Sequence, residues 1–220
     1  MTRLFSYTLR IDDGAAPNPF HGICSLAICK PTIRRTAQVG DWIAGLGSRN
    51  ASAGDLSGCL AYAMKVQKII TLAEYDQRVE NEWPEKIPIV TSRDLAARLG
   101  DCIYSYASGS PHYQRAGVHS VGNKKADLGG LNVLLSEDFY YFGSCAVELP
   151  PHLTPIVHQT QGHKSTANAP YVAPFEHWIR GFGGGGQIFG WPDFVVDWSS
   201  DWVARGCEAR AEESEHDPVC

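Results

Sequence analysis

The residues best suited to acid–base chemistry lie in two polar stretches, where a serine follows His119 and where His163 precedes Lys164 and Ser165. A histidine that titrates near neutral pH can act as a general acid or base, and a nearby lysine can stabilise developing negative charge. Neighbouring side chains of an extended chain point apart, so neither run is itself a nucleophile–base pair. A triad requires His119 to meet Ser165 or Cys29 across the fold. His119, His163 and Lys164 are therefore the catalytic candidates.

Metal and cofactor binding have less support in the sequence. Four histidines form one candidate ligand set: His112, His119, His158 and His163. A second set is the spaced pair Cys24 and Cys29, but the chain contains neither an HExxH nor a CxxC pattern. The GxGxxG spacing in RGFGGGGQIFG follows an expected helix rather than a strand, so it indicates a linker. We predict no metal ion, no cofactor and free thiols at the seven cysteines.

Residues suited to recognising a nucleobase concentrate in the stretch 10–48, with partners later in the chain. A base site needs an apolar surface for stacking and amide or hydroxyl groups for the base edge, while cations suit a phosphate. The predicted ligand-binding residues are Asn18, Lys30, Arg34, Trp42, Ser48, Tyr141, His163, Lys164 and Ser165. If they form one cleft, Asn18, Lys30 or Ser48 must lie near Tyr141 or His163.

Composition places the chain among ordinary globular proteins. Of its 220 residues, 44% are hydrophobic and 20% are charged, and the formal net charge of -5 argues against a non-specific nucleic-acid coat protein. We expect one globular domain over residues 1–203 and a flexible acidic tail over 204–220. The chain lacks an apolar run of roughly 20 residues and begins without a secretory signal, which predicts no membrane partner and a cytoplasmic location.

The elements that must position these residues follow from local patterns. We expect strands over 3–11 and 59–70, and a helix that begins after Thr71 with Glu74 completing a capping box. Further helices are expected in SRDLAARLGD, capped by Ser92, and in APFEHWIRGF, while residues 101–127 read as an irregular loop. In DFYYFG, alternate side chains share a face, and one of the two faces should be core. The order predicts an α+β fold, a small mixed sheet or open β-barrel with peripheral helices.

Several motifs, in order along the chain, resemble one protein family. They are DDGAAPNPF, LAICKPTIRRTAQVGDWIAGLGS, LAYAMKV, LSEDFYYFG, GHKSTAN and FEHWI. Together they resemble the nucleotide modification associated domain family, second type, over roughly residues 3–180. More distantly, VGDWIAGLGS and LAYAMKV are similar to PUA-like domains of the EVE and ASCH groups.

These resemblances imply a context rather than a reaction. The family is associated with phage and bacterial systems that make or handle modified bases in DNA, and the PUA-like resemblance implies a compact barrel whose cleft holds a base. We favour binding of a modified base or nucleotide in a PUA-like cleft, with DNA preferred over RNA. The alternatives are an enzyme, a hydrolase or transferase acting on such a base, and a protein-interaction scaffold. The sequence leaves the choice between binder and enzyme, and the oligomeric state, open.

Overall fold

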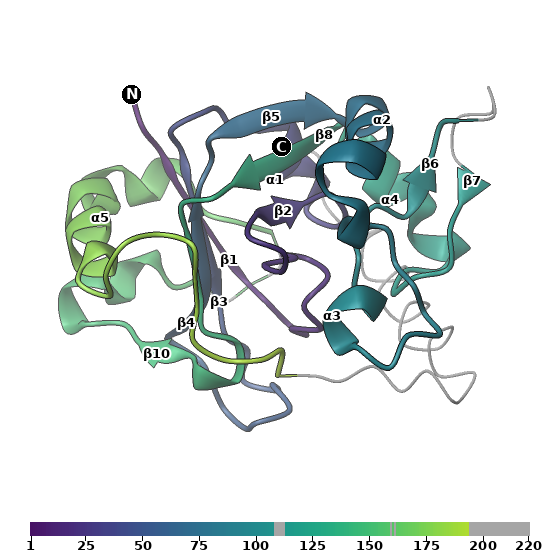
Figure 1. Ribbon diagram of the computed structural model, residues 1–220. Coiled ribbons are helices and arrows are strands. Elements are labelled where there is room, and N and C mark those ends of the chain that lie inside the picture. The colour runs from purple at the N-terminus through teal and green to yellow at the C-terminus, as the bar shows by residue number, and fades with distance from the viewer. Residues whose placement is uncertain (108–112, 159, 161, 194–220) are drawn as a thin grey trace.

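Two β-sheets that share a core organise the chain (Figure 1). The computed structural model describes residues 1–107, 113–158, 160 and 162–193. The strands are β1 Leu4–Thr8, β2 Cys24–Leu26, β3 Trp42–Leu46, β4 Cys59–Lys65, β5 Lys68–Thr71, β6 Tyr104–Ser105, β7 Tyr113–Gln114, β8 Asn132–Ser136, β9 Phe139–Tyr141, β10 Val147–Glu148 and β11 Gln187–Ile188. The α-helices are α1 Pro31–Thr36, α2 Leu72–Glu82, α3 Leu95–Arg98, α4 Lys124–Gly129 and α5 Val172–Arg180. The predicted acidic tail, 204–220, lies outside the described residues.

The strand order defines an α+β architecture with open sheets. The larger sheet runs β1-β3-β4-β9-β11, with β10 paired to β4, and the smaller runs β2-β8-β5. β1 and β3 are parallel, whereas β4 is antiparallel to both β3 and β9. Within the described residues, β1 and β11 are the ends of the larger sheet and do not pair, so this sheet does not close into a barrel.

The sheets and helices form successive layers (Figure 1). One face of the larger sheet packs against α5 through Trp42 and Phe175, whose rings meet edge to face at 5.7 Å. Its other face packs against the smaller sheet, with Tyr62 and Leu134 in the same core. The outer face of the smaller sheet is covered by α2. No helix in the described part of the chain combines the length and the apolar character needed to cross a membrane.

The aromatic strand β9 shows why this layering matters. Phe139 and Tyr141 point into the core between the sheets, and Tyr140 and Phe142 point into the core beneath α5. The predicted alternation is confirmed, because successive side chains of a strand face opposite ways. The expectation that only one pair is core is wrong, since a sheet covered on both faces buries both pairs.

Local signals predict element starts better than element ends. The capping box of Thr71 and Glu74 is confirmed at the start of α2. The expected strand 59–70 is divided into β4 and β5, which belong to different sheets. In the next helix Asp94, not Ser92, is the N-cap, because its carboxylate accepts the Ala96 N–H.

The stretch 101–127 is not wholly irregular. It contains the short β6–β7 pair and the first residues of α4.

Asn18 belongs to a buried polar network that joins the first loop to the 86–101 segment. Its side-chain amide donates to the carbonyl of Leu99 at 2.8 Å and its carbonyl oxygen accepts from the ammonium of Lys86, which also binds the carbonyl of Ile23 at 2.7 Å. Burial lowers the pKa of Lys86 to about 8, although Asp101 opposes this. A buried ammonium requires such partners, so Asn18 has a structural role here.

We predict that Asn18→Ala lowers the free energy of unfolding by about 3 kcal/mol, because it leaves the buried Lys86 ammonium without one acceptor. Denaturant unfolding at neutral pH measures the change. Asn50→Ala is the matched control, since Asn50 is exposed. Equal stability of the two variants would contradict the structural role of Asn18.

Candidate functional site

Three side chains from two distant parts of the chain form a continuous hydrogen-bonded series. The sulfur of Cys29 lies 3.3 Å from Nε2 of His119, and Nδ1 of the same ring lies 2.6 Å from Oδ2 of Asp127. Cys29 lies in the turn between β2 and α1, His119 follows β7, and Asp127 lies in α4. An ionised carboxylate only accepts, so Nδ1 carries a proton and Nε2 faces the sulfur. This is the arrangement of a nucleophile, a base and the group that orients the base.

Asp127 holds the other members of this series in place through several hydrogen bonds. Besides His119, it accepts the backbone N–H of Cys29 at 2.8 Å and the hydroxyl of Tyr104 at 2.9 Å. Burial disfavours its charge, but His119, the Cys29 N–H and the nearby Arg34 hold the pKa of Asp127 below its ordinary value. The carboxylate therefore stays ionised at neutral pH.

His119 is buried, and its charge depends on its two partners. Burial alone would lower its pKa, but the Asp127 carboxylate and Cys29 outweigh burial and raise the pKa of His119 well above its ordinary value. A protonated imidazolium beside a thiol favours the thiolate, which is the nucleophilic form of cysteine. The electrostatics of the site thus favour an activated Cys29.

The backbone at Cys29 is held in an uncommon conformation. Cys29 and Lys30 have φ angles of 58° and 42°, in the left-handed region that residues other than glycine rarely adopt. Such residues persist where surrounding contacts hold them. Here the N–H of Cys29 is bound by Asp127, and its carbonyl accepts from the guanidinium of Arg34 at 3.1 Å.

Arg34 was predicted to bind a ligand, and the structure places it beneath the site instead. Its side chain is fully buried and donates to the carbonyls of Cys29 and Asn132. Gly130 lies against the guanidinium, where an added Cβ would come within 2.3 Å of its central carbon. Arg34 is positioned to support the Cys29 turn and to balance the charge of Asp127.

The series opens onto a cavity of about 170 Å³. Cys29 is partly exposed there, whereas His119 and Asp127 are buried. The other lining residues come from the end of β1 and the chain after it, from the turn that carries Cys29, from the α4 region, and from two positions shortly before His163: Thr8, Leu9, Arg10, Ile11, Asp13, Ala16, Lys30, Asn123, Ala126, Thr160 and Gly162. Of the residues predicted from the sequence, this cavity brings together Lys30 and His119.

Metal binding is a second chemistry that these groups permit. Cys29, His119 and Asp127 each offer a ligand atom within 4.8 Å of the others. However, the thiol and the carboxylate lie on different nitrogens of one imidazole ring, so they form a chain rather than a convergent cage. Structural and catalytic zinc sites use three or four converging protein ligands. The arrangement suits proton transfer better than metal coordination. Of the other predicted metal ligands, His112 lies outside the described residues.

Two predicted stacking residues are buried in the core. Trp42 packs against α5, and Tyr141 is fully buried with its hydroxyl donating to Asp12 at 2.7 Å. Neither ring presents a face to the Cys29 cavity. Sequence pattern could not separate them from site residues, because aromatic residues in strands are typical of both.

The predicted GHKS motif pairs with β1. Its His163 ring packs on Phe5 at 5.5 Å, and the ammonium of Lys164 donates to the carbonyl of Val157 at 2.7 Å. The backbone of Lys164 bridges to Ser6, and Ser165 lies at the end of this bridge. These contacts fix the segment that carries Thr160 and Gly162 to the rim of the cavity.

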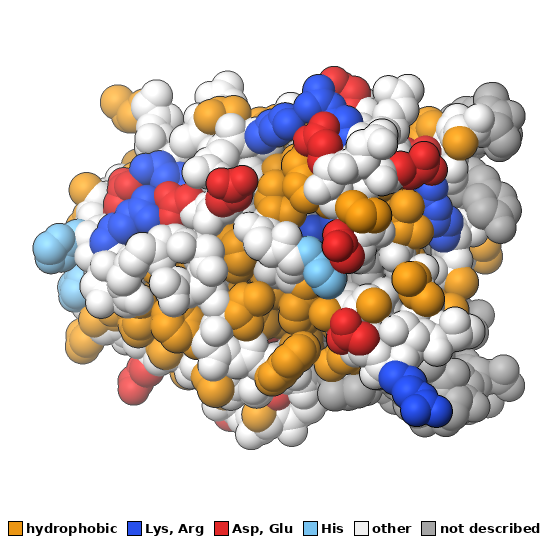
Figure 2. Space-filling view, in the orientation of Figure 1, with side chains coloured by type: hydrophobic (Ala, Val, Ile, Leu, Met, Phe, Trp, Pro, Cys, Tyr) orange, Lys and Arg blue, Asp and Glu red, His pale blue; other side chains and the backbone are white. Residues whose placement is uncertain are grey.

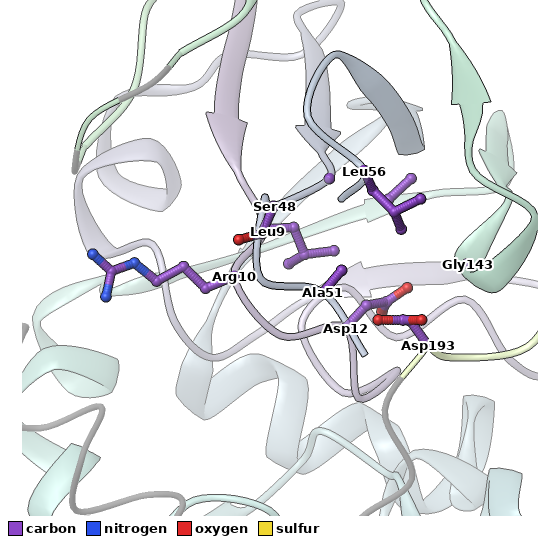
Figure 3. Close-up of a pocket in the computed structure, with 10 residues that line it drawn as sticks. Leu9, Arg10, Asp12, Ser48, Ala51, Leu56, Gly143 and Asp193 are labelled. Atoms are coloured by element: carbon purple, nitrogen blue, oxygen red, sulfur yellow. The ribbon is translucent and has the colours of Figure 1, made fainter. Parts of the chain in front are cut away.

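Ser48 lines a separate and much smaller cavity of about 10 Å³ (Figure 3). A space of this size holds about one water molecule. Asp12 and Asp193 lie at one end of it, while the Arg10 side chain extends away (Figure 3). Burial, aided by Asp13 and Asp193, raises the pKa of Asp12 to about 7.

The surface gives no sign of a broad basic field on the face drawn in Figure 2, where lysines and arginines lie beside acidic side chains. This mixture agrees with the net charge of -5. Binding along a duplex relies on a row of cations that neutralise phosphates.

Asp127 and Tyr104 are site residues that were not predicted from the sequence. Both fall in the stretch that we expected to be irregular, and the helical start KKADLG was the signal available for α4. Of the two partners that the sequence offers for His119, Cys29 and Ser165, the structure selects Cys29.

Fold and site together define an α+β protein with a Cys–His–Asp series at the edge of a small cavity. The chain belongs to the family described as Nucleotide modification associated domain 2, which it matches over residues 1–200. This confirms the family resemblance and links the chain to modified nucleotides. No curated protein and no solved structure matches the chain.

We predict that iodoacetamide alkylates Cys29 at least about 10-fold faster than the exposed Cys145 at mildly acidic pH, because His119 favours its thiolate. Peptide-resolved mass spectrometry measures both rates in one sample. In His119→Ala the rate at Cys29 should fall while that at Cys145 stays unchanged. Equal rates at the two thiols of the unmodified chain would show that Cys29 is not activated.

Asp12 gives a prediction for stability. Between about pH 4 and pH 7 the folded chain holds a proton on Asp12 that the unfolded chain has lost, so this group makes stability fall as pH rises. As the pH rises across this window, the free energy of unfolding of the unmodified chain should fall relative to that of Asp12→Asn. The expected fall is up to about 1.4 kcal/mol per pH unit. Denaturant unfolding at several pH values measures the difference. Asp55→Asn is the control, because Asp55 is exposed and its pKa is lowered by Ser57. A pH-independent difference for Asp12→Asn would contradict the assignment.

Proposed function

We propose that this chain is an enzyme, a hydrolase or transferase, that acts on a modified nucleotide or nucleobase with Cys29 as its nucleophile. The observation that carries the proposal is the unbroken series from the sulfur of Cys29, through both nitrogens of His119, to Asp127. A binding site does not require a buried imidazole that links a thiol to a carboxylate. The family supplies the substrate class.

The three residues divide the work of covalent catalysis. His119 takes the thiol proton and later gives it to the leaving group, as a general base and then a general acid. Asp127 keeps the ring oriented with Nε2 toward the sulfur and stabilises the imidazolium. Tyr104 and the Cys29 N–H hold the carboxylate in place. Precise placement of this kind is what lowers the entropic barrier to attack.

The cavity limits what part of a substrate can enter. Its volume of about 170 Å³ lies below the range of roughly 300–1,000 Å³ for sites that hold drug-sized ligands. A base or a substituent fits this space better than a complete nucleotide. The rest of the substrate would remain outside, which accommodates a base within DNA, our preferred substrate, as well as a free nucleotide.

Binding without chemistry is the second candidate function, and the cavity itself favours it. A base-sized space lined by Lys30, Arg10 and polar groups is also what a reader of modified bases needs. In this case the open sheets would provide a PUA-like cleft. Substrate turnover separates the two functions.

We predict that Cys29→Ser abolishes turnover while leaving ligand affinity nearly unchanged, because it removes the nucleophile and alters the cavity by one atom. The assay incubates the protein with a panel of modified nucleosides, nucleotides and modified DNA and follows product formation by mass spectrometry. At least one substrate should be consumed, and the variant should turn it over at least about 10³-fold more slowly.

Calorimetry on the same compounds supplies the second measurement, and Cys145→Ser is the control that should keep full activity. Binding of a compound with no turnover by the unmodified chain would favour the reader. Unimpaired turnover by Cys29→Ser would contradict the assignment of the nucleophile.

A further inference from the structure

The surroundings of Cys29 narrow the reaction class, on the condition that the proposed function holds. We infer that the bond attacked by Cys29 is an acyl bond, an amide or ester in a small substituent of the nucleotide, and not a phosphate ester. The inference follows from where the hydrogen-bond donors, the charges and the acid–base group lie around the sulfur.

The strongest donors next to Cys29 face away from a ligand. A phosphoryl group under attack carries charge on three equatorial oxygens, which several backbone amides or a guanidinium must surround, whereas an acyl group develops charge on a single oxygen. Here the N–H of Cys29 binds Asp127, and the Arg34 guanidinium is fully buried and binds the carbonyls of Cys29 and Asn132. Neither group is oriented to receive a phosphoryl oxygen beside the sulfur.

The charges that line the cavity are balanced. Among the described lining residues, Arg10 and Lys30 are cationic and Asp13 and Asp127 are acidic, while the His119 imidazolium is offset by the Cys29 thiolate that it favours. The ammonium of Lys30 lies 4.4 Å from the centroid of the Tyr7 ring, so it already makes a cation–π interaction with that ring. A phosphate carries at least one full negative charge and favours a positive site, whereas an amide or ester is neutral.

Neutral hydrogen-bonding groups complete the lining. Thr8, Asn123 and Thr160, which carry hydroxyl or amide groups, line the same cavity. Asn123 is held by the N–H of Ser120, which donates to its side-chain oxygen at 3.1 Å. A lining of this composition suits a polar but uncharged acyl group.

His119 is also placed for the leaving group that acyl transfer produces. The thiolate of Cys29 forms a bond to the acyl carbon, the C–N or C–O bond breaks, and the departing amine or alcohol takes the proton from Nε2 of His119. Water then attacks the thioester, His119 accepts its proton, and the C–S bond breaks to regenerate the thiolate. The products are a carboxylic acid and the amine or alcohol.

The test uses two kinds of probe on the full chain. N4-acetylcytidine, N6-acetyladenosine and 4-nitrophenyl acetate present acyl groups, and 4-nitrophenyl phosphate presents a phosphoryl group. We expect acylation of Cys29, seen by peptide mass spectrometry and reversed by neutral hydroxylamine, with no phosphorylation and no inhibition by vanadate. His119→Gln should slow acylation at least about 100-fold, and Cys145→Ser should not change it.

The outcomes separate the inference from the proposed function. Phosphorylation of Cys29, or inhibition by vanadate, would overturn the acyl inference and leave Cys29 as a nucleophile. The acyl inference would also be overturned, with Cys29 still a nucleophile, if Cys29 reacts rapidly with iodoacetamide but accepts an acyl group from none of the probes. Slow reaction of Cys29 with every reagent, at the rate of Cys145, would instead remove the proposed function. Melting temperatures of the variants show whether each one is folded.

Discussion

The buried carboxylate of Asp127 is the interaction on which the site depends. It accepts hydrogen bonds from Cys29, Tyr104 and His119, which come from three separate segments. An isolated buried carboxylate would be strongly unfavourable, so its three donors and the nearby Arg34 charge are required for it to remain ionised. The same contacts set the position of the Cys29 backbone and the orientation of the His119 ring. One group therefore couples the stability of this region to its chemistry.

The two-sheet scaffold explains why the site lies where it does. Both faces of the larger sheet are covered, so its aromatic side chains, including Trp42 and Tyr141, stabilise the core rather than receive a ligand. The reactive groups instead lie beyond the smaller sheet, in the turn after β2 and in the segment that ends with α4. The cavity is also lined by the chain after β1 and by Thr160 and Gly162, and nearby Lys164 forms a backbone bridge to Ser6 of β1. Rigid layers thus hold a site built mostly from connecting segments.

The family and the geometry answer different questions about function. Membership in the Nucleotide modification associated domain 2 family concerns the kind of molecule, a modified nucleotide. The Cys29–His119–Asp127 series supports the chemistry that we propose, nucleophilic attack assisted by a general acid and base. This geometry is the reason that we propose an enzyme and place a base reader second. The reason is physical, since the expected stacking rings are buried and His119, one of the catalytic candidates, has the Cys29 sulfur on one nitrogen and the Asp127 carboxylate on the other.

The sequence by itself determined the features that depend on residues close together in the chain. The capping box at Thr71 and the two faces of β9 depend on spacings of two or three residues, and the family depends on short motifs. Only the tertiary structure decided which distant groups meet. Cys29 and His119 are 90 positions apart, and their contact depends on how α4 packs beside the turn after β2. Local sequence patterns do not encode such long-range packing. His119 was therefore one of several catalytic candidates in the sequence, and only the fold shows that Cys29 and Asp127 are its partners.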